Sequence, residues 1–167
     1  MTSPQKSKGN AWENTVAKHL SQLYGESFIR VPHSGAYIGG VNQHRKEVLH
    51  EGQIRGFKGD LIPGQSFPRL NAECKSYKDF PFHQLFQGSC KTLDGWIEQC
   101  MAVADKGDFN IILMKFNRKG TYTAVPRYHT LKFHRHIEYS YQEQIWNFME
   151  YDLFWQHNAA AVKQLCA

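Results

Sequence analysis

The stretch that decides the expected fold runs from Gly59-Asp60-Leu61-Ile62-Pro63-Gly64 to the tripeptide Glu73-Cys74-Lys75. Pro63-Gly64 is a turn signal, and both the short apolar run before it and residues 69–75 after it have the composition of strands. We therefore expect a hairpin that brings the side chain of Asp60 close to that of Glu73.

The residue types in this stretch suit metal-assisted hydrolysis of a phosphodiester. Alternation along a strand places Glu73 and Lys75 on one face and turns Cys74 into the core. The carboxylates of Asp60 and Glu73 are hard oxygen ligands for Mg²⁺, with Mn²⁺ as a substitute, and the carbonyl of Cys74 is a further ligand. Lys75 would orient or activate the attacking water. Taken alone, such a tripeptide is usually a solvated charge pair, and it is the context that favours a functional role.

A helix is expected near the N-terminus, with Gly25 as its stop signal. Its apolar stripe consists of Trp12, Val16, Leu20 and Leu23. Asn10 and Glu13 match an N-cap residue and its reciprocal capping glutamate. Glu13 is also a candidate for supporting the metal site, and the two roles are compatible because a carboxylate at a helix N-terminus remains able to accept a metal-bound water.

The remaining chain predicts further elements of an α/β protein. Residues 93–104 have the apolar periodicity of a helix, and residues 109–116 form a nearly continuous apolar run, typical of a strand covered on both faces. A turn at residues 117–120 leads into a strand at 121–125, and residues 159–165 predict a short helix. We expect one domain over residues 1–167, with a mixed sheet and the carboxylates at one edge.

The segment 126–167 is rich in aromatic residues and is expected to extend a core formed by about residues 6–125. The aromatic residues are Tyr139, Tyr141, Trp146, Phe148, Tyr151, Phe154 and Trp155. Core packing, a subunit interface and stacking on nucleic-acid bases all remain open for them.

Charge is unevenly distributed along the chain. The formal net charge is +5 and the sequence pI is near 9.0. Residues 1–58 contain eight Lys and Arg against four Glu, a net +4, which leaves +1 for residues 59–167. These cations could contact phosphates, although a soluble basic surface would look the same. Residues 35–59 are glycine-rich and are expected to form either a substrate-facing flap or an ordinary insertion.

Cysteine usage and hydropathy favour an intracellular protein. The four cysteines include no C-x-x-C pair, and we expect them to be reduced. We also expect no membrane span and no signal-peptide core. The spacing of His129, His134 and His136 could suggest zinc, but these histidines lack cysteine partners and a helical metal motif.

The order of motifs resembles the PD-(D/E)xK nuclease superfamily. The motifs are Lys8-Gly9-x-x-x-Glu13, Arg30-Val31-Pro32-His33-Ser34-Gly35, Gly59-Asp60 and Glu73-Cys74-Lys75. Within the superfamily the order is most similar to archaeal-type Holliday junction resolvases. The segment Phe80-Pro81-Phe82 and a later helix with Gln99 resemble bacterial resolvases of the RecU type. The chain departs from the pattern at Asn14, where the archaeal enzymes usually carry arginine, and at Gly59, where the superfamily has proline.

The resemblance implies a restriction-endonuclease-like mixed sheet flanked by helices and a role for each matched residue. Asp60 and Glu73 would bind the metal, with Glu13 supporting the site, and Lys75 would serve the nucleophilic water. Ser34 would lie near the scissile phosphate and is a further catalytic candidate. The expected DNA-binding residues are Lys8, Arg30, Ser34, Arg55, Lys58, Gln99 and Lys115.

The function expected from this resemblance is a metal-dependent endonuclease acting on branched DNA such as Holliday junctions. Symmetrical cutting of a four-way junction needs two active sites, so a homodimer is expected. Two alternatives remain. A nuclease of the same fold could cut linear, damaged or foreign DNA, or the chain could be a nucleic-acid-binding module without catalysis.

Overall fold

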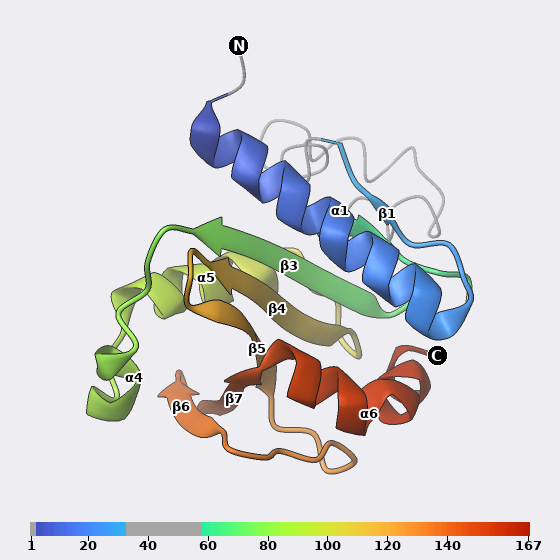
Figure 1. Ribbon diagram of the computed structural model, residues 1–167. Helices are drawn as coiled ribbons and strands as arrows, with labels where there is room; N and C mark the ends of the chain where they lie inside the picture. Colours follow the sequence, from blue (N-terminus) through green and yellow to red (C-terminus); the bar gives the residue numbers. More distant parts are fainter. Residues whose placement is uncertain (1–2, 33–57) are drawn as a thin grey trace.

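The computed structural model describes residues 3–32 and 58–167 (Figure 1). In chain order the elements are α1 (Pro4–Tyr24), β1 (Ile29–Arg30), β2 (Leu61–Ile62), β3 (Leu70–Tyr77), α4 (His83–Gln87), α5 (Lys91–Ala102), β4 (Phe109–Phe116), β5 (Gly120–Pro126), β6 (Ile137–Tyr141), β7 (Gln144–Glu150) and α6 (Tyr151–Cys166). The predicted α/β fold class is confirmed, and the arrangement is consistent with a restriction-endonuclease-like fold.

A five-stranded mixed sheet forms the centre of the protein, with the strand order β3-β4-β5-β7-β6. β3 and β4 are parallel, and α4 and α5 lie in the connection between them. The pairs β4–β5, β5–β7 and β6–β7 are antiparallel. β3 is therefore an edge strand of this sheet, as expected for the strand that carries the tripeptide.

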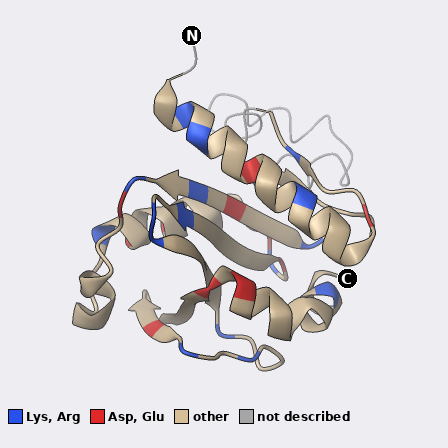
Figure 2. Ribbon diagram, viewed as in Figure 1, with Lys and Arg blue, Asp and Glu red and all other residues tan. Residues whose placement is uncertain are grey.

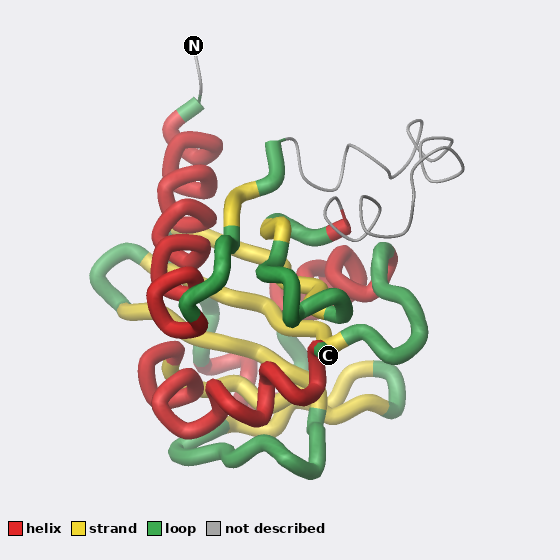
Figure 3. Tube along the Cα trace, turned by 90° about the vertical axis from the view of Figure 1, so that its right-hand side faces the viewer, coloured by secondary structure: helices red, strands yellow, loops and turns green. Residues whose placement is uncertain are grey.

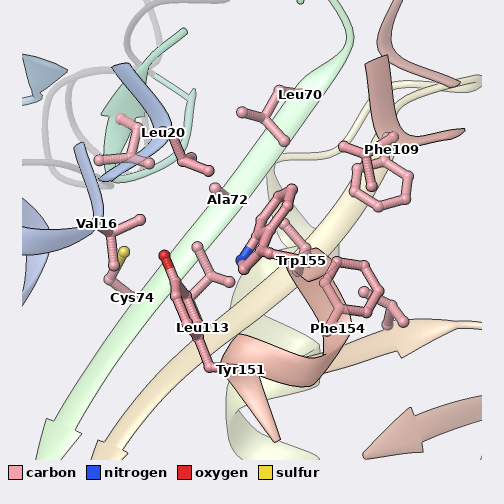
Figure 4. Packing of buried hydrophobic residues seen from close by; sticks show 14 of the residues in the cluster. Val16, Leu20, Leu70, Ala72, Cys74, Phe109, Leu113, Tyr151, Phe154 and Trp155 are labelled. Carbon is pink, nitrogen blue, oxygen red and sulfur yellow. The ribbon is translucent and has the colours of Figure 1, made fainter. Parts of the chain in front are cut away.

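Helices cover both faces of the sheet. Figure 3 shows α1 and α6 on one side of the strands and α5 on the other. The α1 and α6 side buries alternate residues of β3 and β4, among them Ala72, Cys74 and Leu113. Figure 4 shows Cys74 in this cluster beside Val16 of α1. The α5 side buries the intervening positions, including Ile112 and Met114. The alternation predicted for Cys74 is confirmed.

Helix α1 begins earlier than expected. Ser3 is the N-cap, its side chain accepts a hydrogen bond from the backbone N–H of Lys6, and Pro4 occupies the first helical position. The predicted cap at Asn10 is wrong, because Asn10 lies inside the helix. Gly25 ends the helix as predicted, with φ 66° and its N–H donated to the carbonyl of Ser21.

The predicted hairpin has a different partner in the structure. β2 pairs with β1 in an antiparallel arrangement, Arg30 opposite Leu61, and does not form a ladder with β3. Asp60 nevertheless lies against β3, because its backbone N–H donates to the carbonyl of Ala72 at 2.8 Å. The expected proximity of Asp60 to β3 is therefore present, although β2 itself belongs to a separate two-stranded sheet.

The C-terminal segment completes the same sheet and core. β6 and β7 are two of the five strands, and α6 is longer than the short helix predicted at 159–165. Tyr139, Trp146, Phe148, Tyr151, Phe154 and Trp155 are all buried, and Tyr141 is half-buried. Core packing therefore accounts for most of this aromatic cluster.

Candidate active site

Strand β3 presents Glu73 and Lys75 on the face that carries α5. Glu73 lies opposite Ile112 and Lys75 opposite Met114, and both partners belong to the core beneath α5. Acidic and basic positions follow each other along this strand in Figure 2. Glu73 is 6% exposed and Lys75 is 9% exposed, and Lys75 Nζ lies 3.1 Å from Glu73 Oε1. Burial of both side chains argues against a solvated surface charge pair.

Two hydrogen bonds fix Asp60 against β3. Besides the bond from its own N–H to Ala72, its Oδ2 accepts the backbone N–H of Cys74 at 2.6 Å. Asp60 is 6% exposed. These bonds go to Ala72 and Cys74, the two neighbours of Glu73. The carboxylate of Asp60 therefore lies beside Glu73.

Gly59 allows this close approach. A Cβ atom at this position would lie 2.6 Å from the carbonyl oxygen of Ala72 and 3.2 Å from Oδ1 of Asn71. Any residue with a Cβ, proline included, would push the chain away from β3. The departure from the superfamily proline at this position therefore has a steric reason.

Glu13 of α1 faces the same site and is held by Arg30. Arg30 Nε donates to Glu13 Oε2 at 2.5 Å, and Arg30 Nη2 donates to Asn10 Oδ1 at 2.8 Å. The side chain of Glu13 is 12% exposed. Asn10 therefore positions Arg30 rather than capping the helix, a role that no local sequence signal indicates.

Neighbouring carboxylates contribute to raised pKa values at Glu13 and Glu73. Burial, followed by the charge of Asp60, raises the pKa of Glu13 to about 7 against the opposing effect of Arg30. Burial and the charge of Asp60 likewise raise the pKa of Glu73 to about 7, with a further contribution from Glu13, against the opposing effect of Lys75. Glu13, Asp60 and Glu73 thus form one electrostatic cluster at the edge of the sheet.

Gln99 of α5 reaches Lys75 from the other side. Its Oε1 accepts a hydrogen bond from Lys75 Nζ at 2.5 Å. The predicted position of Gln99 off the apolar stripe of its helix is confirmed, because the residue is exposed whereas Ile97 and Cys100 are buried. Lys75 is therefore held between Glu73 and Gln99.

The donor chemistry of this cluster fits a hard divalent cation. Within residues 3–32 and 58–167, no three His, Cys, Asp or Glu side chains are placed to hold an ion by themselves. Two buried carboxylates, Asp60 and Glu73, raise the energy of the cluster when both are ionised, and a cation between them would offset this repulsion. The residues present thus fit an oxygen-ligated ion that is completed by water or phosphate oxygens.

Several predicted DNA-binding residues lie apart from the cluster. Lys58 is 3% exposed and forms ion pairs with Asp105 and Asp108. Lys115 is exposed, but it lies opposite Ser76, so strand alternation turns it to the α1 and α6 face, away from Glu73 and Lys75. Lys8 is exposed on α1. Ser34 and Arg55, together with the predicted flap, lie outside the described residues.

The partners of Lys58 could not be predicted from the sequence. Asp105 and Asp108 lie in the connection from α5 to β4, and Asp108 also accepts the backbone N–H of Asp105. Neither aspartate belongs to a recognisable motif. Their separation from Lys58 by 47 and 50 residues means that only the tertiary fold could reveal the contact.

Comparison with known proteins identifies the family. In the part of the chain that the structure describes, no helix is long and apolar enough to cross a membrane. Curated proteins and solved structures give no significant match. A family model described as "Phage putative PDDEXK endonuclease" matches residues 4–161, a range that contains Glu13, Asp60, Glu73 and Lys75. The description names no junction-resolving activity. The chain belongs to this phage endonuclease family and thereby to the PD-(D/E)xK nucleases, which generally use divalent metals.

Proposed function

We propose that the protein is a Mg²⁺-dependent DNA endonuclease that hydrolyses phosphodiester bonds in branched DNA, with four-way junctions as its preferred substrate. The observation that carries the nuclease assignment is the meeting of Asp60, Glu73 and Lys75 in one buried site beside Glu13. A binding module has little use for carboxylates that face phosphates without a cation, so this arrangement favours catalysis over binding alone.

In this mechanism Asp60 and Glu73 would hold Mg²⁺, or Mn²⁺ in its place, and the carbonyl of Cys74 is available as a further ligand. The cation, when bound, supplies charge stabilisation at the phosphate and a lower pKa for an attacking water. Lys75, fixed by Glu73 and Gln99, orients that water toward the phosphorus atom. Glu13 supports the site from α1, and its ion pair with Arg30 keeps the carboxylate turned toward the cluster.

The preference for branched DNA is supported by the order of motifs and by the basic excess in residues 1–58. A junction is recognised by shape and by the spacing of its phosphates, and base contacts are not required. Symmetrical resolution requires two active sites, so the proposal includes a homodimer with twofold symmetry. Ser34 and Arg55 are proposed to lie along the DNA path, with Ser34 near the scissile phosphate.

The test is strand cleavage in Mg²⁺ with three labelled substrates: an immobile four-way junction, a linear duplex and a single strand. Paired symmetrical nicks confined to the junction support the full proposal. Cutting of every substrate supports a nuclease of broader specificity and overturns the junction preference. Binding without cutting by the wild type overturns the nuclease assignment and favours the binding module. Glu73→Gln is the control for contaminating nucleases, because it should bind and not cut.

A further inference from the structure

A hollow of about 500 Å³ lies beside the start of β5 and the end of β7, and it is lined by residues from both faces of the sheet. We call it the base pocket. Its apolar wall is formed by Phe82, Tyr122 and Phe148, and its polar rim includes Lys119, Arg135 and Glu150. None of these six residues belongs to the cluster of Glu13, Asp60, Glu73 and Lys75. The volume is within the usual range for small-molecule sites.

Strand register relates the base pocket to the active site. Lys75 pairs with Met114 and Met114 with Tyr122, so these side chains lie in one row on one face of the sheet. In the adjacent row, Glu73 is connected through Ile112 and Ala124 to Phe148. With neighbouring strands about 4.8 Å apart, Tyr122 is about 10 Å from Lys75 and Phe148 about 14 Å from Glu73 along the sheet. Because these lines cross the core beneath α5, a DNA strand that passes around it would span at least roughly three to four nucleotides.

Two of the three rings of the aromatic wall are partly accessible to a ligand, whereas Phe148 is 3% exposed. Phe82 and Tyr122 are half-buried, with ring centroids 5.2 Å apart. Tyr122 also lies 5.5 Å from Phe148. Rings that are packed on one side and open on the other suit the stacking of a flat aromatic group, which contributes about 1 to 3 kcal/mol for a nucleobase.

The rim adds positive charge and a hydrogen-bond acceptor. Lys119 is exposed and pairs with Asp79. Arg135 is exposed, and its guanidinium makes no hydrogen bond or ion pair with any residue of 3–32 or 58–167. Arg135 also has a φ of 48°, an uncommon conformation for a residue with a side chain. Glu150 can accept hydrogen bonds from N–H groups at the edge of a base. Lys119 and Arg135 can bind the phosphate of the same nucleotide.

A second hollow of about 560 Å³ adjoins the base pocket. It shares Phe82 and Lys119 with the base pocket and includes Asp79 and Pro81, which follow the end of β3. The two hollows therefore adjoin at Phe82 and Lys119, beyond the C-terminal end of the strand that carries Glu73 and Lys75.

We propose that the base pocket receives an unstacked base from the DNA strand, a few nucleotides from the cleavage position. This inference rests on the proposed nuclease function, because it takes the ligand of the pocket to be the same DNA. Branches that carry a single-stranded arm or a gap expose unpaired bases near the branch point, whereas unstacking a base from a fully paired duplex costs a few kcal/mol. The pocket would therefore contribute to a preference for branched over linear DNA.

The proposal is tested by binding in EDTA, where metal-dependent cleavage is absent. The probe is a branched DNA with 2-aminopurine at an unpaired position beside the branch, and a fully paired duplex with the same label is the comparison. The wild type should bind the branched probe more tightly and quench its fluorescence by stacking. Arg135→Gln should weaken this binding about tenfold, and Phe82→Leu should reduce the quenching.

Arg118→Gln is the matched control, because Arg118 is also an exposed arginine with positive φ, 58°, but does not line the base pocket. It should bind as the wild type does. Equal affinity and quenching in wild type, Arg135→Gln and Phe82→Leu would overturn the proposal. Deoxyadenosine monophosphate that binds without competing against the branched probe would identify a free nucleotide as the ligand and also overturn it. If the wild type passes this binding test but cuts no DNA in Mg²⁺, the proposal for the base pocket stands and the proposed nuclease function is wrong.

Discussion

The backbone N–H of Cys74 donates to Oδ2 of Asp60 at 2.6 Å, so a strand residue whose thiol lies in the core fixes one of the candidate metal ligands. The two functions of Cys74 are separated by the alternation of the strand. Its side chain packs beside α1, and burial raises the pKa of its thiol well above the usual range, so the thiol stays protonated. Its main chain serves the active site.

The Asp60–Cys74 bond predicts different outcomes for two substitutions of Asp60. Asp60→Asn can keep an oxygen on the N–H of Cys74, so it should abolish cleavage with little change in the free energy of unfolding. Asp60→Ala removes the acceptor of a buried N–H and should lower the free energy of unfolding by about 1 to 3 kcal/mol. Urea denaturation of both variants measures this difference. Equal stability of the two would show that the bond contributes nothing to the fold.

The raised pKa of Glu73 predicts that stability falls as the pH rises. An acid whose pKa rises from 4.5 unfolded to about 7 folded contributes stability that is fully present below pH 4.5 and is lost by the time the pH passes 7. Between pH 5 and 8 the free energy of unfolding should decrease by on the order of 2 kcal/mol. Glu73→Gln should weaken this dependence and leave the part that comes from Glu13, whose pKa is also raised to about 7. Saturating Mg²⁺ at pH 8 should stabilise the wild type and not this variant.

Glu143→Gln is the control for the pH experiment, because Glu143 is exposed in the turn between β6 and β7. Its pH dependence should match that of the wild type. A wild-type stability that rises between pH 5 and 8 would contradict the assignment of Glu73 to a crowded, negatively charged site.

The buried ion pairs of Lys58 predict a structural rather than a DNA-binding role. Lys58 lies two residues before Asp60, and Asp108 beside it has a side chain only 1% exposed. Lys58→Met removes a buried countercharge and should lower the free energy of unfolding by about 3 kcal/mol. The double variant Lys58→Met with Asp108→Leu should recover most of this loss. A single variant that folds normally and only weakens DNA binding would restore the phosphate-contact interpretation.

Local patterns predicted the elements whose signals are contained in one segment. The apolar run at 109–116 is β4 with the same bounds, and the periodicity at 93–104 corresponds to α5 with a shift of two residues. Gly25 ends α1 because only a residue without a Cβ adopts its left-handed conformation without strain. These features depend on steric and hydrophobic rules that act over a few residues.

Contacts between distant segments could not be predicted in the same way. β1 and β2 have two residues each, and nothing in Leu61-Ile62 distinguishes Ile29-Arg30 from β3 as its pairing partner. Asn10 has the residue type of a cap, yet its side chain binds Arg30 across a separation of 20 residues. The candidate site was nevertheless located from the sequence, because Asp60, Glu73 and Lys75 are marked by their types and order even where the pairing was wrong.

The hydrogen bond between Gln99 and Lys75 predicts a positioning role that can be separated from folding. Gln99→Ala leaves the ion pair of Lys75 with Glu73 but removes the acceptor on α5, so the ammonium group becomes less well oriented. We expect kcat for DNA cleavage to fall about tenfold, equivalent to about 1.4 kcal/mol, with KM and the free energy of unfolding nearly unchanged. Gln99→Glu should leave an acceptor and recover part of the rate. Gln87→Ala, an exposed glutamine at the end of α4, is the matched control and should cut at the wild-type rate. Because Gln99 is exposed, its substitution should not unfold the protein. An unchanged kcat in Gln99→Ala would show that Gln99 is only a solvated surface residue of α5.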